Sequence, residues 1–169
     1  MSTARKSAPR KPLGSTPGAT GTPAAPAALG TWLAVVNAYH LCERLMSHRL
    51  AALGVKTAEH EILANLLRDP GLTQRTLAER CFTAKSHASA LLDAMEERGW
   101  VRREPNPVDA RSKQLFLTRA GERLAARTAA VQAEVIAGMC AGETHEALVE
   151  VRAAMLRVGE RLQAMPGDA

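Results

Sequence analysis

Two clusters of side chains in the middle of the sequence carry groups that bind phosphates and hydrogen-bond to base edges. The first holds Lys85, Ser86, His87 and Ser89, and the second is the run DARSK at residues 109–113. Cationic groups neutralise phosphates, whereas hydroxyls and imidazoles can hydrogen-bond to base edges in a groove. A polar helix face is usually only solvated, and a charged loop is usually only a loop. The elements that carry the clusters therefore decide between nucleic-acid binding and simple solvation.

The first cluster lies in a predicted pair of short helices. Thr73 is a good N-cap residue, and the apolar residues after it share one helical face: Leu77, Ala78 and Cys81. After a break near Phe82, apolar residues recur at spacings of three and four: Ala88, Leu91, Leu92 and Met95. Gly99 supplies the left-handed residue that ends the second helix, and Arg98 stands in the last turn, where the helix dipole favours a cation. Because the apolar stripe is buried, the cluster at the start of this helix faces outward.

The second cluster lies at the tip of a predicted β-hairpin. Residues 100–103 and 114–117 are strand-like, and the PNP at residues 105–107 forbids a helix between them. An arginine on a projecting tip can enter the narrow minor groove, and we expect Asp109 to pair with the guanidinium of Arg111. Two helices followed by a basic hairpin predict a winged helix-turn-helix that binds DNA. The predicted fold is mainly α with a small β-hairpin wing (α+β).

The stretch from residue 72 to residue 124 closely resembles the MarR family of bacterial winged-helix transcriptional regulators. The strongest matches are the pair Leu77-Ala78, the run 91–101, the D-x-R-S-K of residues 109–113 and the L-T-x-x-G of residues 117–121. The order of elements matches the family from about residue 31 to about residue 165. The resemblance implies an obligate homodimer and palindromic operator DNA, often with release by a small ligand or an oxidant.

The chain departs from the family pattern at three places in the helix pair. The family commonly has a glycine in the turn, a capping serine and a Thr-Arg pair on the recognition helix, where this chain has Phe82, Ala84 and Ser89-Ala90. We expect Thr83 to take over the cap. Because the arginine is missing, other polar side chains must carry more of the base reading. The predicted DNA-contacting residues are Thr73, Gln74, Arg75, Thr83, Lys85, Ser86, His87, Ser89, Arg103, Asp109, Arg111, Ser112 and Lys113.

The positive charge is concentrated where DNA contacts are predicted. The 169 residues carry a formal charge of +5. Residues 72–119 hold nine cationic and six acidic residues, a net of +3, and residues 1–30 hold four cations and no acid. A basic isoelectric point alone is weak support for a nucleic-acid partner, whereas this distribution is stronger support.

The first 29 residues are predicted to be a disordered basic tail rich in Ala and Pro, acting either as a non-specific phosphate contact or as an inert linker. They lack the apolar block of a secretory signal, and no run in the chain approaches the roughly 20 apolar residues that span a bilayer. We therefore expect a cytoplasmic protein without a membrane partner. Residues 30–165 are expected to form one MarR-type domain, with the winged helix at 57–118 and dimerisation helices at 31–53 and 119–165.

The dimerisation region is predicted from apolar stripes on long helices. In the helix that Gly54 closes, the stripe is Trp32, Val35, Tyr39, Cys42, Met46, Leu50 and Leu53. Thr57 is expected to cap the next helix, which buries Ile62, Leu63, Leu66 and Leu67 and ends at residues 69–71. Thr118 caps a fifth helix whose stripe is Leu124, Thr128, Val131, Val135 and Met139.

The last helix, capped by Thr144, has a stripe with coiled-coil-like spacing: Leu148, Val151, Met155, Val158, Leu162 and Met165. We expect such a regular apolar stripe to be buried against another surface, and the simplest partner is the same surface of a second copy. Packing within its own subunit is the alternative.

A small-molecule switch follows from the resemblance. It implies an effector pocket among the first, second and fifth helices, and family ligands are often aromatic carboxylates. The polar candidates are His40, Arg44, Arg49 and His60, although such residues are more often ordinary surface residues or satisfied interhelical ones. A ligand releases DNA only if it binds one separation of the recognition helices better than another. We expect a repressor, because occupying a promoter requires no contact with polymerase.

Two alternative functions stay open, and enzymatic ones do poorly. Some MarR-like proteins sense oxidants through a first-helix cysteine, so Cys42 is the redox candidate; Cys81 and Cys140 also lie on apolar stripes, where cysteine usually acts as a small hydrophobe. A winged helix can also serve only as a protein-interaction adaptor. The histidines and cysteines show no metal-ligand spacing, and no HExxH, GxSxG, P-loop or GxGxxG occurs, so we expect no enzyme, metal or cofactor.

Overall fold

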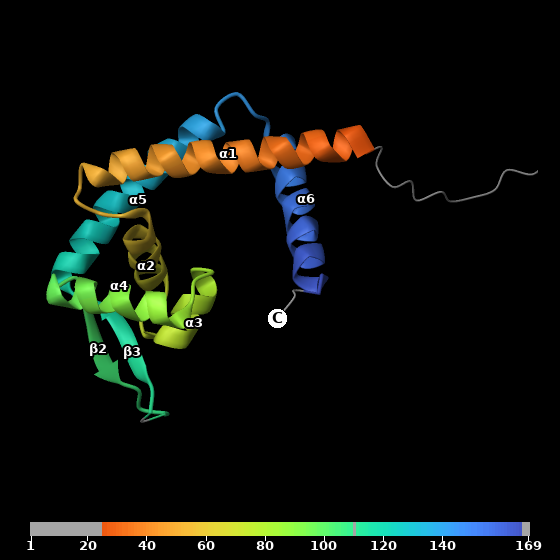
Figure 1. Cartoon of the computed structure of the whole chain (residues 1–169). Coiled ribbons are helices and arrows are strands. Elements are labelled where there is room, and N and C mark those ends of the chain that lie inside the picture. The colour runs from red at the N-terminus through yellow and green to blue at the C-terminus, as the bar shows by residue number, and fades with distance from the viewer. Residues whose placement is uncertain (1–24, 110, 167–169) are drawn as a thin grey trace, which may run out of the picture. The chain divides into compact units, whose positions relative to one another are not determined.

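The computed structural model describes residues 25–109 and 111–166 (Figure 1). Its elements are α1 (Ala25–Ala51), α2 (Thr57–Arg68), β1 (Leu72–Thr73), α3 (Gln74–Arg80), α4 (Lys85–Glu97), β2 (Val101–Pro105), β3 (Lys113–Leu117), α5 (Arg119–Met139) and α6 (His145–Ala164). The part of α1 up to Ala38 belongs to one compact unit and the chain from Tyr39 onward to another. This order confirms the predicted mainly helical fold with a winged helix-turn-helix.

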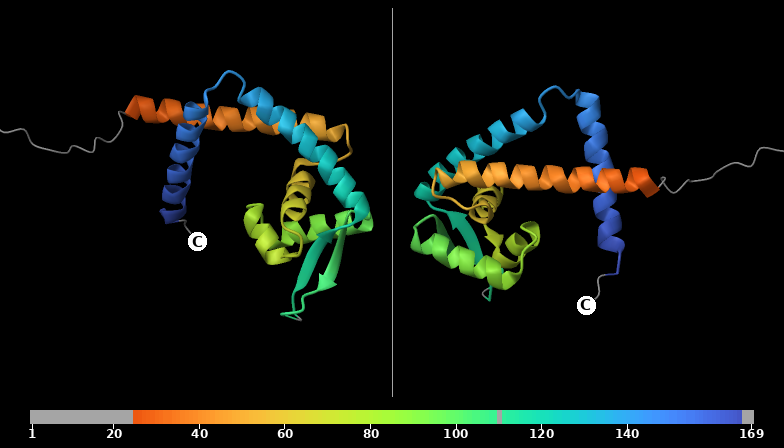
Figure 2. Two further views of the ribbon diagram at one scale, coloured as in Figure 1. Left: turned by 180° about the vertical axis from the view of Figure 1, so that it is seen from behind. Right: turned by 45° about the horizontal axis from the view of Figure 1, so that its top comes forward.

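The wing is a small antiparallel sheet with strand order β1-β3-β2. β2 and β3 pair from Val101 opposite Leu117 to Pro105 opposite Lys113, and β1 adds a two-residue edge. In both Figure 1 and the left view of Figure 2 the β2–β3 hairpin extends beyond α3 and α4. The predicted hairpin is therefore confirmed, whereas β1 is too short to leave a periodic signal.

The core forms around α2, which contacts α3, α4, α5 and β3. Its largest fully buried side chains come from every neighbouring element: Leu50, Ile62, Leu63, Leu66, Leu77, Leu92, Met95, Val101, Leu115 and Thr128. The stripes predicted for the helix pair supply Leu77 and Ala78 from α3 and Ala88, Leu92 and Met95 from α4. Burial of these faces fixes which side of α4 is left to solvent.

The start of α5 is locked onto the wing. Thr118 caps the helix by accepting from the backbone N–H of Gly121 at 3.1 Å, and its hydroxyl donates to the carbonyl of Gly99 at 2.6 Å. A Cβ at position 121 would lie 2.0 Å from the carbonyl oxygen of Trp100. The L-T-x-x-G motif therefore marks a close approach between α5 and the residue before β2.

α1 begins earlier than expected. The helix starts at Ala25, so residues 25–29, which we expected in the tail, are helical; residues 1–24 lie outside the described range. Alanine is the best helix former, and proline at position 26 is tolerated because first-turn N–H groups have no intrahelical acceptor. The predicted tail was too long at this end.

Two predicted helix caps were wrong. Lys56, not Thr57, is the N-cap of α2, and the backbone N–H of Lys56 donates to the Glu59 carboxylate at 2.8 Å. Ala84 is the N-cap of α4 and no side chain caps it, so Thr83 does not take over that role. The Thr73, Thr118 and Thr144 caps are confirmed by hydroxyls that accept from backbone N–H groups three residues later.

Several predicted core residues are exposed in the single chain. Leu67 and Met139 are 43% and 62% exposed, so they lie outside the buried faces of α2 and α5. α6 has no buried residue, and its predicted stripe faces solvent along the whole helix. Trp32, Val35 and Tyr39 of α1 are also exposed. These surfaces have no cover among the described residues of one chain.

Candidate nucleic-acid interface and effector cavity

A concavity of about 480 Å³ lies between the starts of α3 and α4 and the wing tip. It is lined by Thr73, Gln74, Arg75, Lys85, Asn106, Asp109, Arg111, Ser112 and Lys113. Eight of the thirteen predicted DNA-contacting residues are thus brought together from segments far apart in the sequence. Asn106 was not predicted as a DNA-contacting residue, because the sequence indicated only that it forms part of a turn.

The wing tip is held by its own hydrogen bonds. Asn106 Nδ2 donates to Ser112 Oγ at 2.9 Å, and the backbone N–H of Asn106 donates to the carbonyl of Ser112 at 3.2 Å. Asp109 Oδ1 accepts from the backbone N–H of Arg111 at 3.0 Å. The expected pairing of Asp109 with the Arg111 guanidinium is therefore wrong: the carboxylate fixes the backbone of the loop, a common Asx turn.

The cations around the concavity are available for phosphate. Lys85, Arg111 and Lys113 are exposed and form no ion pair among the residues that the structure describes. Arg75 pairs only with its own helix neighbour Glu79, at 3.0 Å and with both side chains largely exposed. Exposed i,i+4 pairs contribute only a few tenths of a kcal/mol, so this pair yields easily to a phosphate.

The outer face of α4 carries the remaining predicted groups. Ser86 and His87 are exposed, and Ser89 is half-buried. Thr83, in the turn before α4, is half-buried as well. Because no side chain caps α4, the first N–H groups of the helix are open to an acceptor, and such helix ends favour anions.

Arg103, which was predicted to contact DNA, forms ion pairs with acidic residues of α4. Its side chain is only 14% exposed and binds Asp93 at 2.6 Å and Glu96, both on α4. Burial works to lower the pKa of Arg103, but the hydrogen bonds and charges of the two acids outweigh burial and raise it. The residue ties β2 to the recognition helix, and its guanidinium is occupied by acids of the protein itself.

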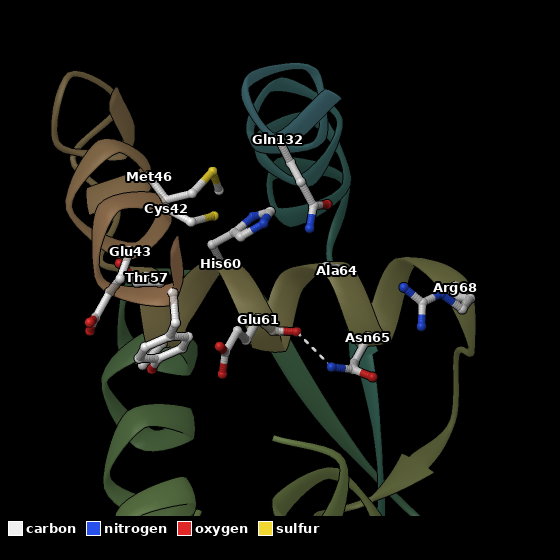
Figure 3. Close-up of a pocket in the computed structure, with 12 residues that line it drawn as sticks. Cys42, Glu43, Met46, Thr57, His60, Glu61, Ala64, Asn65, Arg68 and Gln132 are labelled. Carbon is white, nitrogen blue, oxygen red and sulfur yellow. Dashed lines mark hydrogen bonds between the residues drawn. The ribbon is translucent and has the colours of Figure 1, made fainter. Parts of the chain in front are cut away.

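A second cavity, of about 410 Å³, lies among α1, α2 and α5, where the resemblance placed an effector pocket (Figure 3). It is lined by Tyr39, Cys42, Glu43, Met46, Thr57, Ala58, His60, Glu61, Ala64, Asn65, Arg68 and Gln132. Of the four polar residues predicted for it, His60 alone lines it. Sequence reasoning missed the other charged and amide side chains of the lining, which are Glu43, Glu61, Asn65, Arg68 and Gln132.

The other three candidates lie elsewhere. His40 is exposed and 3.7 Å from Glu43, and Arg49 pairs with Glu134 of α5 at 3.0 Å. Arg44 is exposed. None of the three lines the cavity.

His60 is the unusual group in this cavity. It is 3% exposed, and neither ring nitrogen has a hydrogen-bond partner. Figure 3 shows its ring pointing into the space between α1 and α5, with Gln132 reaching towards the same space. Burial lowers the pKa of His60, which favours the neutral form of the ring. Burial and the charge of Glu43 raise the pKa of the neighbouring Glu61 carboxyl.

The cysteines form no disulfide among the described residues. Cys42 lines the cavity and is half-buried. Burial and the charge of Glu61 raise the pKa of the Cys81 thiol, which disfavours the reactive thiolate there. Within residues 25–109 and 111–166, no group of three or more His, Cys, Asp or Glu side chains is arranged to hold a metal ion. None of the described helices combines the length and apolar character needed to cross a membrane.

Residues 53–112 match the sequence profile of the MarR family, and they span α2, β1, α3, α4, β2 and the wing tip but not β3. The winged-helix part of the chain thus matches the MarR family. The transcriptional regulator HosA of Escherichia coli O111:H- is 29% identical over 96 residues, which cover 55% of this chain and 71% of HosA. Further HosA sequences from Escherichia coli match at 32% over 68 residues, half of their length.

Solved structures of MarR proteins share the fold. AbsC, a MarR family transcriptional regulator from Streptomyces coelicolor, superposes with a TM-score of 0.75 at 24% identity, covering 81% of this chain and 95% of AbsC. A mutant of MarR from Escherichia coli complexed with operator DNA superposes with a TM-score of 0.67 at 22% identity, covering 78% of this chain and 93% of that one. The sequence profile and the HosA sequences are those of MarR-family transcriptional regulators, and the winged-helix fold is shared with solved MarR-family structures.

Proposed function

We propose that this MarR-family regulator is a homodimeric repressor that binds palindromic operator DNA and releases it when a small ligand enters the cavity beside His60. The observation that carries the DNA-binding part is the concavity between α3, α4 and the wing tip. There the side chains of three separate segments converge, and several are cations without an acidic partner among the described residues. The similarity to a MarR protein complexed with operator DNA supports the same part.

The groups in this face suit two grooves of one duplex. α4 presents Lys85, Ser86 and His87 on its outer side, as a recognition helix does in the major groove. The wing holds Arg111 on a loop stiffened by Asp109, and the narrow minor groove next to it has the strongest negative potential. We expect Lys113 and Arg75 to contact the phosphates between the two grooves.

The exposed stripe of α6 supports a dimer. Its members Val151, Leu162 and Met165 are 59%, 63% and 64% exposed in the single chain. Burying such side chains stabilises an interface by roughly 1.5–3 kcal/mol each, and a two-fold partner offers the same stripe in return. Two recognition helices held roughly 34 Å apart would read the two halves of a palindrome.

Ligand release needs a connection between the cavity and α4, and the residue next to His60 supplies one. Glu59 is 4% exposed and accepts from Arg98, the C-cap residue of α4, at 3.2 Å. Arg98 also donates to the carbonyl of Gly54 at 2.9 Å and lies 3.5 Å from the centre of the Trp100 ring. A ligand that shifts α2 therefore moves the end of the recognition helix.

Selection of bound sites from random double-stranded DNA by the full chain tests the proposal. We expect enrichment of an inverted repeat whose half-sites lie one helical turn apart, roughly 10 base pairs centre to centre. Failure to enrich any duplex at low salt would contradict it and would favour a winged helix used for protein contacts. Enrichment of a single half-site would contradict the dimer.

A further inference from the structure

The cavity among α1, α2 and α5 contains more acid than base. Its lining includes the carboxyl groups of Glu43 and Glu61, the guanidinium of Arg68 and the imidazole of His60. Arg68 is exposed and stands seven residues after Glu61 on α2, roughly 10 Å along the helix axis. The end of the cavity near α1 is therefore acidic without a compensating cation.

The two carboxyl groups lack strong partners of their own. Glu61 forms no ion pair among the described residues, and Glu43 is near only the exposed His40, at 3.7 Å. Burial is the larger cause of the raised pKa of Glu61, and the charge of Glu43 adds to it. A cation placed beside both would relieve the repulsion, whereas a second anion would add to it.

His60 supplies an independent sign that the cavity accepts a ligand. The side chain is only 3% exposed, lines the cavity, and leaves both ring nitrogens without a partner. A buried polar atom without a hydrogen bond costs roughly 1–3 kcal/mol. A ligand with a hydroxyl, amide or amine group would recover part of that free energy by bonding to the ring.

A neighbouring concavity extends the acidic end towards the recognition helix. It measures about 360 Å³ and shares Tyr39, Ala58 and Glu61 with the first cavity. Its other lining residues include Phe82 and His87, and none is a lysine or an arginine. Aromatic faces at Tyr39 and Phe82 favour a ring and, in the right position, a cation.

We propose that the effector cavity takes an aromatic amine in its protonated form, with the ammonium group beside Glu43 and Glu61 and a hydrogen bond to His60. This inference rests on the proposed function, because it assumes that the cavity is the effector site. It replaces the aromatic carboxylates that the family resemblance implied. A carboxylate at the α1 end would meet two acids, and the one arginine lies at the other end of the cavity.

A panel of ligands on one ring system tests the charge preference. The full chain is titrated calorimetrically at pH 7.5, without DNA, with 2-naphthylmethylamine, 2-naphthylmethanol and 2-naphthoate. We expect the amine to bind at least tenfold more tightly than the naphthoate, with the neutral alcohol between them. Equal or tighter binding of the naphthoate would overturn the proposal, and so would the absence of measurable amine binding at millimolar concentration.

Variants locate the site. Glu61→Gln should weaken amine binding at least tenfold and leave alcohol binding within about twofold. Glu150→Gln, on the exposed side of α6, is the matched control and should leave both unchanged. Amine binding that survives the double variant Glu43→Gln/Glu61→Gln would overturn the proposal.

Operator release, measured separately by fluorescence anisotropy, distinguishes this inference from the proposed function. An amine that binds through Glu61 without releasing DNA would contradict the ligand-controlled repressor and leave the site assignment standing. A naphthoate that binds and releases DNA would contradict the preference for an amine and leave the ligand-controlled repressor standing.

Discussion

His60 loses water on both ring nitrogens when the chain folds, and no protein group among the described residues replaces it. The consequence is a pH dependence. Above about pH 6.5 the imidazole is neutral in both states. Below that value the unfolded chain binds a proton that the buried ring resists, because burial lowers the pKa of His60 in the fold. The free energy of unfolding therefore falls as the pH drops.

Between pH 7.5 and pH 5.5, we expect His60 to contribute a loss of up to about 1 kcal/mol to the free energy of unfolding. Denaturant unfolding of the wild type and of His60→Leu at both pH values measures it, and the variant should show the smaller loss. Glu61 acts in the opposite direction, since its raised pKa favours proton uptake by the fold, but it is present in both proteins and cancels. Identical pH dependence in the two proteins would contradict this role for His60.

Single residues also mark where sequence reasoning succeeded and where it stopped. Phe82 stands in the turn where the family commonly has glycine, and the structure gives it a φ of 48° with 93% of the side chain exposed. That departure could be found from the motif alone. The exclusion of His40, Arg44 and Arg49 from the cavity could not, because it depends on how α1 is rotated against α2 and α5.

At the scale of elements, the packing of α5 against the wing depends on the absence of a Cβ at Gly121. The Cβ of an alanine at position 121 would meet the backbone of Trp100 at 2.0 Å, and backbone cannot rotate away as a side chain can. We expect Gly121→Ala to lower the free energy of unfolding by about 2–3 kcal/mol. Gly138→Ala, also on α5 but with open space around it, should instead raise it by roughly 0.5–1 kcal/mol. Thermal and denaturant unfolding of both variants measures the contrast, and equal effects would refute it.

Arg103 links the wing to the recognition helix through its two acidic partners. Its replacement by alanine leaves Asp93 and Glu96 unpaired and frees β2 from α4. We expect Arg103→Ala to weaken operator binding about tenfold while leaving the salt dependence of binding unchanged, because the number of neutralised phosphates stays the same. Arg102→Ala is the matched control, since Arg102 pairs only with Glu104 on the same strand and packs over Phe116. A reduced salt slope for Arg103→Ala would show a direct phosphate contact and contradict the positioning role.

The elements were predictable where their signals are local. Caps at Thr73, Thr118 and Thr144 and the left-handed Gly99 were each read from one or two residues and are confirmed. The start of α2 was missed because Glu59 satisfies the Lys56 N–H from inside the helix. β1 was missed because two residues carry no periodicity and pair only through β3.

At the scale of the whole molecule, charge and apolar surface are divided between different parts of the chain. Residues 72–119 carry a net charge of +3 and hold the concavity with its exposed cations. α6 carries an apolar stripe without a buried residue. Composition and spacing predicted both surfaces, and their partners, a polyanion and a second copy of the chain, stay predictions. The sign of the charge in the cavity among α1, α2 and α5 could not be predicted, because Glu43, Glu61 and Arg68 meet there only in the folded chain.

DNA recognition through the wing is tested by measuring binding to a selected operator duplex, by fluorescence anisotropy, across a range of salt concentrations. We expect tight binding by the wild type. Arg111→Ala should weaken it and lower the log-log salt slope by about 0.9 for each phosphate that is no longer neutralised. Arg127→Ala, which removes an exposed cation of α5 away from the concavity, should change neither quantity. DNA binding by this face would be contradicted if Arg111→Ala left both the affinity and the slope at their wild-type values.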